Sequence, residues 1–146
     1  MPETPDISID ELVGNFEFLG DWEERFGYLI ELGKKLPALE PGEKIEANRV
    51  RGCQATVHLC MIPNSCEPPT FNIRADADAF IVKGLIAVLL LVYNNKTAEE
   101  IIEANAPGVL RRLGLDRHLS PTRRNGLRSM VKRIETLAEK SLTQTG

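Results

Sequence analysis

The sequence has few aromatic residues and no excess of basic ones. Phenylalanine, tryptophan and tyrosine make up 5% of the 146 residues, and 21 acidic against 18 basic residues give a formal net charge of −3. Nucleic-acid-binding proteins rely on basic patches and often on aromatic side chains that stack on bases. The composition therefore argues against a nucleic-acid partner. With 42% hydrophobic and 27% charged residues, it is typical of a soluble globular domain.

Cysteine and long apolar runs are also scarce. The three cysteines are an odd set, whereas a secreted disulfide scaffold carries a larger, even one, so we expect a reducing, cytoplasmic environment. Residues 1–11 are acidic and lack the basic and apolar regions of a signal peptide. The longest apolar run, Ala79–Tyr93, contains Lys83 and Gly84 and is too short to span a bilayer comfortably. We predict a buried helix there and no membrane partner.

Helix-capping patterns predict several further helices. Ser8 or Asp10 is expected to cap a helix that runs through Leu19, and Asp21 to cap one that ends near Leu36-Pro37. A capping box, in which Glu100 follows Thr97 by three residues, predicts another helix start. Asp76 or Asp78 is expected to cap the buried helix, and the last helix is expected to begin near Ser120-Pro121.

The middle of the chain is predicted to form strands. Three short runs, Arg49–Arg51, Thr56–Ile62 and Thr70–Arg74, are separated by turn residues, and their close spacing favours an antiparallel meander. Helices before and after these strands indicate an α+β fold, a small three-stranded antiparallel sheet packed by helices. The length fits a single domain covering residues 1–146, with residues 1–8 and 139–146 as loose ends.

Cys53 is the leading candidate for chemistry. It follows Gly52, which permits the left-handed backbone of a turn, and on an extended strand Arg49 and Arg51 would point to its side. Nearby cations favour the thiolate, so we expect a lowered thiol pKa. No histidine is adjacent in sequence, and a lone mobile thiolate best serves sulfur exchange with another molecule. The alternative is an ordinary buried turn cysteine.

The remaining candidate residues favour structural roles. Cys60 is expected to pack within a strand, Cys66 to lie in a loop, and His58 and His118 to be structural. The cysteines are separated by six and five residues without a CxxC pair, so no metal-binding site is predicted. Arg123 and Arg124 oppose the dipole of the last helix, which suggests pairing with a carboxylate or a partner. A solvated surface arginine is the alternative.

The chain resembles the SufE family of sulfur acceptors, which partner cysteine desulfurases. Three segments carry the resemblance in the right order: Asn48–Gln54 (Asn-Arg-Val-Arg-Gly-Cys-Gln), Asp76–Val88 and His118–Leu127. The earlier run Trp22–Gly33 also fits, so the similarity extends from about Ile9 to Ala138. Each segment alone is modest evidence, but all of them in one order are specific.

The resemblance implies a fold related to the IscU-type iron–sulfur scaffolds. It implies that Cys53 accepts persulfide sulfur from a SufS- or CsdA-like desulfurase and passes it to an iron–sulfur scaffold. The cysteine loop, with Arg51, Gly52 and Gln54, would be sheltered at rest and move to the partner. Asp78 and Arg123 fall on positions tied to partner engagement and loop control. Pyridoxal phosphate would belong to the desulfurase, so this chain is expected to hold no cofactor and to be an accessory protein rather than an enzyme.

Departures from the family pattern leave the subtype open. Ala55, His58 and Thr122 stand where serine, tryptophan and serine are common, and the SufE and CsdE types share the same framework. Two other functions remain: an iron–sulfur or zinc scaffold, which needs other ligands to converge with Cys53, and a regulator that binds a desulfurase without accepting sulfur. A monomer or weak homodimer is expected.

Overall fold

The longest apolar run of the sequence forms the central helix, α3 (Phe80–Tyr93). The computed structural model describes residues 7–144, so the outermost parts of the predicted loose ends, residues 1–6 and 145–146, lie outside the described residues. Nearly every residue of α3 from Gly84 to Tyr93 is buried, as expected of a helix that is apolar on all sides. The prediction of a buried helix is confirmed. Within residues 7–144, no helix is both long enough and apolar enough to cross a membrane.

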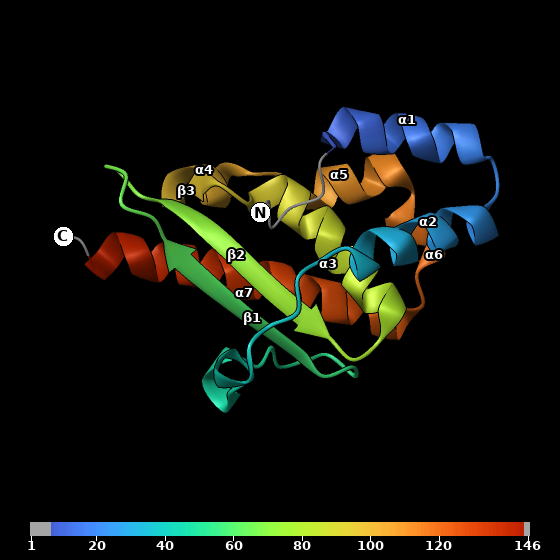
Figure 1. The fold of residues 1–146 in the computed structure, drawn as a ribbon. Helices are drawn as coiled ribbons and strands as arrows, with labels where there is room; N and C mark the ends of the chain where they lie inside the picture. The colour runs from blue at the N-terminus through green and yellow to red at the C-terminus, as the bar shows by residue number, and fades with distance from the viewer. Residues whose placement is uncertain (1–6, 145–146) are drawn as a thin grey trace.

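Helices precede and follow a small sheet (Figure 1). In chain order the elements are α1 (Ile9–Leu19), α2 (Trp22–Lys34), the 3₁₀ turns η1 (Pro41–Glu43) and η2 (Glu46–Asn48), β1 (Val57–Pro63), β2 (Thr70–Ala77), α3, β3 (Lys96–Thr97), α4 (Ala98–Glu103), α5 (Ala106–Leu113), α6 (Leu115–His118) and α7 (Pro121–Gln144). The long β1–β2 ribbon crosses in front of helix α7 in Figure 1, and β2 packs against α3.

The predicted capping residues begin three of the helices. Ser8, rather than Asp10, caps α1, and Asp21 caps α2; each side-chain oxygen accepts a hydrogen bond from a backbone N–H three residues later. Thr97 and Glu100 form the predicted capping box of α4. These bonds satisfy N–H groups that lack a partner within the helix, which explains why the helices begin at these residues.

The sheet is antiparallel with strand order β1-β2-β3, which confirms the α+β fold with three antiparallel strands. Strand β1 pairs with β2 from Val57 opposite Ala77 to Pro63 opposite Phe71. The third strand is a two-residue segment, Lys96–Thr97, which pairs with the start of β2. It follows α3 in the chain and therefore ties the end of the central helix back to the sheet.

The prediction that Arg49–Arg51 forms the third strand is wrong. Arg49 makes only an isolated bridge with His58, and the Val50 N–H donates to the Val57 carbonyl at 2.9 Å. The chain then turns, because Gly52 has a φ of +88°. A left-handed residue at this point ends the extended conformation before a ladder can form.

Two further predictions are corrected by the structure. Neither Asp76 nor Asp78 caps α3: Asp76 lies inside β2, which runs on to Ala77, and the N-cap position is Ala79, without a side-chain hydrogen bond. Helix α7 continues to Gln144, so residues 139–144, expected to be loose, are helical. In both cases the regular element extends further than the sequence pattern indicated.

Helices α2 and α3 cross at two glycines. A Cβ atom on Gly33 would lie 2.5 Å from the Gly84 backbone nitrogen, and one on Gly84 would collide with the Leu29 carbonyl. Only hydrogen atoms on these α-carbons allow the two backbones to approach so closely. The crossing holds α3 in place, and the beginning of α3 contributes to the candidate site described below.

Candidate functional site

Residues 50–56, which we call the Cys53 loop, pack against the first half of α7. The loop turns at Gly52, where a Cβ atom would collide with the Ser129 hydroxyl oxygen of α7. Glycine suits this position for two reasons: its φ is positive, which side chains disfavour, and a Cβ atom would force the Ser129 hydroxyl to move. The Ser129 hydroxyl is itself held by the Asn125 carbonyl at 3.0 Å. The close approach of Gly52 to Ser129 places the next residue, Cys53, beside α7.

Cys53 is partly buried against the backbone of α7. Its thiol donates a hydrogen bond to the Gly126 carbonyl oxygen, with Sγ and O 3.4 Å apart. A Cβ atom added at Gly126 would lie 3.5 Å from Sγ, in ordinary van der Waals contact, so the thiol lies close to the helix backbone without depending on a glycine there. The thiol is thus sheltered but not sealed inside the core.

The pKa of the Cys53 thiol is raised by burial, which contradicts the prediction of a lowered pKa. The prediction assumed that Arg49 and Arg51 lie beside the thiol on an extended strand. Instead, Arg51 is exposed and pairs with Glu46, while Arg49 belongs to the bridge with His58. Desolvation favours the neutral thiol, so the resting Cys53 is a weaker nucleophile than an exposed cysteine at neutral pH.

A pocket of about 290 Å³ opens beside Cys53. Three parts of the chain line it: the Cys53 loop, the junction of β2 with α3, and α7. Its lining residues are Cys53, Gln54, Ala55, Asp78, Ala79, Val82, Leu85, Thr122, Arg123, Gly126, Leu127 and Met130. Of the residues predicted from the sequence, the structure brings Cys53, Gln54, Asp78 and Arg123 together here. Arg51 and Gly52 belong to the same loop but do not line the pocket.

Asp78 anchors the C-terminal end of the Cys53 loop. Its carboxylate accepts a hydrogen bond from the Thr56 N–H at 3.0 Å, and its own N–H donates to the Thr56 carbonyl at 3.2 Å. This pair of bonds connects the loop to the β2–α3 junction. The contact gives Asp78 a structural role that the helix-cap prediction did not foresee.

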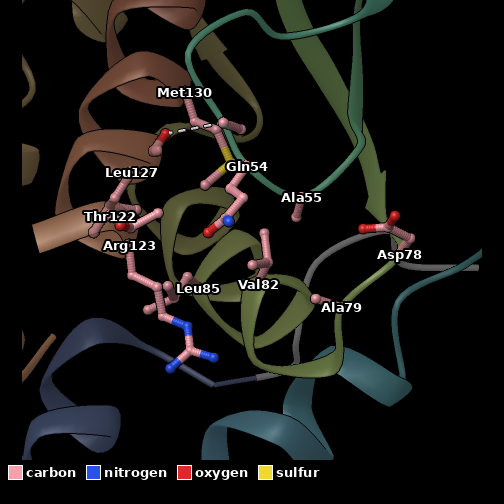
Figure 2. A pocket seen from close by; sticks show the side chains of 12 residues that line it. Gln54, Ala55, Asp78, Ala79, Val82, Leu85, Thr122, Arg123, Leu127 and Met130 are labelled. Carbon is pink, nitrogen blue, oxygen red and sulfur yellow. Dashed lines mark hydrogen bonds between the residues drawn. The ribbon is translucent and has the colours of Figure 1, made fainter. Parts of the chain in front are cut away.

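Arg123 provides an exposed cation at the other side of the pocket. In Figure 2, Asp78 and Arg123 lie on opposite sides, with Gln54 and Val82 between them. Within residues 7–144, no carboxylate lies within ion-pair distance of the Arg123 guanidinium, although its backbone N–H donates to Ser120 Oγ at 3.3 Å. The alternative in which Arg123 pairs with a carboxylate of its own chain finds no support in the described residues.

The other cysteines and the histidines lie outside this pocket. Cys60 is a half-buried β1 residue whose sulfur accepts a hydrogen bond from the Asn48 amide at 3.3 Å, and Cys66 is exposed in the loop between β1 and β2. The pKa of Cys60 is raised by burial and by Glu43, with Arg74 opposing them. His118 stacks on Trp22 with 3.9 Å between ring centroids, as expected of a structural residue. In the described part of the chain, no three His, Cys, Asp or Glu side chains are grouped to hold a metal ion.

Sequence reasoning missed the role of α7 in sheltering Cys53. Gly126 and Ser129 contact the Cys53 loop although they follow it by more than 70 residues in the chain. Gly126 falls inside one of the segments that resemble the SufE family, and a glycine within a helix is itself a signal of close approach. Nothing in the local sequence identified Cys53 as the group that approaches it.

Comparisons with known proteins find relatives over most of the chain. Residues 10–138 match the SufE family, described as an Fe-S metabolism associated domain. An uncharacterized SufE-like protein of Rhizobium meliloti (strain 1021) is 40% identical over 133 residues, which cover 90% of this chain and 95% of that protein. A counterpart in Rhizobium etli, also described as an uncharacterized SufE-like protein, is 43% identical over 133 residues and 90% of each chain.

A solved structure has the same fold. The solution structure of a hypothetical protein from Thermus thermophilus superposes with a TM-score of 0.72 and is 25% identical in sequence. The similarity covers 92% of this chain and 96% of that one. The fold therefore extends over nearly the whole length of both proteins.

Proposed function

The chain belongs to the SufE family, and on this premise we propose that it accepts sulfur at Cys53 from a cysteine desulfurase and thereby stimulates that enzyme. Membership associates the chain with iron–sulfur metabolism. The sulfur would pass on to a scaffold on which iron–sulfur clusters are assembled. The observation that carries the proposal is the placement of Cys53, which lies on a glycine-containing turn at a pocket.

The transfer is a thiol exchange. Cys53 first loses its proton, and the thiolate then attacks the outer sulfur of the persulfide on the partner's cysteine. The partner's S–S bond breaks as a new S–S bond forms at Cys53, and the partner cysteine leaves as a thiolate. The outer sulfur, as a persulfide anion or its protonated form, is then bonded to Cys53. One persulfide is exchanged for another, so no external oxidant or reductant is required.

The sheltered thiol supports a step in which docking exposes it. At rest, burial keeps Cys53 protonated, and its hydrogen bond to Gly126 holds it against α7. Release from α7 would remove the desolvation that raises its pKa and would increase the thiolate fraction. A loop that is reactive only when docked would also protect a persulfide from the thiols of the cytoplasm, where we place this protein.

The residues around Cys53 have separate proposed roles in this step. Asp78 anchors the end of the loop through Thr56, and Arg123 offers its exposed guanidinium to the partner. Gln54 lines the pocket next to the thiol, and Arg51 extends from the exposed turn. In this proposal pyridoxal phosphate resides on the desulfurase, so the chain acts as an accessory protein, as a monomer or weak homodimer.

The test is intact-mass analysis after incubation with a cysteine desulfurase from the same genome and L-cysteine. We expect added sulfur on Cys53 by peptide mapping, its removal by reductant, and no such addition in Cys53→Ser. Cys60→Ser and Cys66→Ser are matched controls and should still accept sulfur. If Cys53→Ser stimulates the desulfurase as well as the unmodified protein does, the chain is a regulator and not an acceptor.

A further inference from the structure

A second and larger cavity lies between α5, α6 and α7. This α5–α7 groove has a volume of about 640 Å³. Its lining residues are Pro107, Leu110, Arg111, Asp116, Leu119, Arg124, Leu127, Arg128, Val131, Lys132 and Glu135. The proposed sulfur transfer uses none of the charged residues among them.

The groove combines apolar side chains with an excess of positive charge. Five of its lining residues are apolar, and four cations face two carboxylates, Asp116 and Glu135. The local charge is therefore positive although the whole chain carries −3. Within the described residues, no carboxylate lies within ion-pair distance of Arg111, Arg128 or Lys132.

Three of the cations form a stripe along α7. Arg124, Arg128 and Lys132 follow each other at intervals of four residues, so neighbouring like charges lie on one face of the helix. Arg124 is also in the first turns of α7, where the helix dipole disfavours positive charge. Its guanidinium donates to the Asp116 carbonyl at 3.3 Å, but Arg128 and Lys132 gain no such contact among the described residues. Repulsion among these like charges thus destabilises α7 in the unbound protein. An anionic partner bound along the stripe would offset that repulsion.

We propose that the α5–α7 groove binds an acidic amphipathic segment of the desulfurase that supplies sulfur to Cys53. The choice of partner rests on the proposed function. It is supported by continuity, because Leu127 lines both the Cys53 pocket and the groove. An acidic amphipathic helix would place apolar residues on the groove floor and carboxylates opposite Arg128 and Lys132. A partner docked over Cys53 would then extend along α7.

Other anionic ligands fit the groove less well. A small inorganic anion would leave the apolar floor in contact with water. A nucleic acid would find no aromatic side chain among the lining residues for base stacking. The mixture of an apolar floor with a cationic rim is the pattern that an amphipathic protein segment complements.

The test measures the affinity of the full-length protein for a cysteine desulfurase from the same genome. Arg128→Glu is expected to raise Kd about fivefold at low salt, because one favourable exposed pair becomes repulsive. The difference should shrink at about 0.5 M salt, where exposed charges are screened. The matched control is Lys140→Glu, an exposed cation on α7 outside the groove, which should leave Kd unchanged.

Thermal unfolding separates binding from a structural role. Arg128→Glu places a carboxylate between Arg124 and Lys132, so its Tm should equal or exceed that of the unmodified protein. Three outcomes would overturn the inference. Lys140→Glu could lose as much affinity as Arg128→Glu, Arg128→Glu could lose none, or the loss in Arg128→Glu could accompany a lower Tm that explains it. If the unmodified protein binds the desulfurase but Cys53 gains no sulfur, the acceptor proposal fails, while weakened binding of Arg128→Glu still supports the groove.

Discussion

At the residue scale, the pKa of Cys53 depends on the burial of its thiol more than on the residues next to it in the sequence. Two arginines precede it within four residues, but Arg51 turns away to Glu46 and burial against α7 dominates. The hydrogen bond to Gly126 stabilises the neutral thiol in the resting state. A thiol held in this way is less reactive than an exposed one, because a smaller fraction of it is ionised at neutral pH.

The pH dependence of Cys53 alkylation tests this state. We expect the rate with iodoacetamide to rise with pH around a midpoint above the ordinary thiol pKa of about 8.5, because only the thiolate reacts. Since the folded-state pKa is raised, the stabilisation from the neutral thiol is full below the unfolded pKa and is lost as pH rises through the folded value. Mass mapping of the alkylated Cys53 peptide gives the rate.

The same peptide in urea-unfolded protein is the control. Its midpoint should return to the ordinary thiol range, since unfolding removes the burial. Adding a desulfurase that lacks its own reactive cysteine should lower the Cys53 midpoint if docking exposes the loop. A midpoint that is identical in folded and unfolded protein would contradict the shelter by α7.

At the element scale, close backbone contacts position the site. Gly52 lets the Cys53 loop lie on α7, and Gly33 and Gly84 let α2 lie on α3. The second contact is remote from Cys53, but the N-terminal part of α3 supplies Val82 and Leu85 to the pocket. Displacement of α3 would therefore change the pocket without any substitution in it.

Gly84→Ala should destabilise the protein by about 1–3 kcal/mol, the usual cost of overpacking a close-packed interface. The added methyl group would meet the Leu29 backbone, which cannot move without shifting α2. Chemical denaturation followed by far-UV circular dichroism gives the free energy of unfolding.

Gly27→Ala is the matched control in the same pair of helices. Gly27 lies in α2, and a methyl group added there would have no atom within 4 Å, so alanine should stabilise the protein by about 0.5–1 kcal/mol through its helix propensity. If both variants change the free energy of unfolding in the same direction, the close backbone contact at Gly84 does not determine how α2 packs on α3.

At the scale of the whole molecule, Asp76 joins three separate parts of the chain. From β2 its carboxylate pairs with Lys83 of α3 at 3.3 Å and with Lys44, which follows η1, at 3.6 Å. Burial opposes ionisation of this carboxyl group, but the Ala77 N–H and the two lysines outweigh it, so the pKa of Asp76 is lowered. The Asp76 carboxylate thus connects the sheet to the central helix and to the segment before the Cys53 loop.

The free energy of unfolding should therefore depend on the ionisation of Asp76. Because its folded pKa is depressed, its contribution is full above the unfolded pKa of about 3.9 and is lost as pH falls through the lower folded value. Asp76→Asn should cost about 1–3 kcal/mol at pH 7, since the charged hydrogen bonds and both ion pairs are lost.

Urea unfolding of Asp76→Asn and the unmodified protein between pH 7 and acid measures this effect. The two stabilities should converge as pH falls below about 4. Glu139→Gln, which changes an exposed carboxylate of α7, should stay within about 0.5 kcal/mol of the unmodified protein. A constant difference between Asp76→Asn and the unmodified protein at every pH would mean that packing, not charge, accounts for the cost.

The local sequence determined the features that depend on a few neighbouring residues. The caps at Ser8, Asp21 and Thr97 could be predicted because each hydrogen bond spans only three residues. The apolar run predicted α3 because a helix without a polar face must be buried. The collinear segments, of which only one contains Cys53, were enough to indicate the SufE family, because their residues and their order are properties of the sequence alone.

Only the tertiary structure decided the environment of the thiol and the edge of the sheet. The third strand is formed by Lys96–Thr97, a segment too short to show a strand pattern, and not by Arg49–Arg51, which Gly52 turns away. Cys53 meets Gly126 across 73 residues, a contact that no local pattern specifies. The direction of its pKa follows from burial, which is a property of the packed molecule, whereas the neighbouring arginines are a property of the sequence.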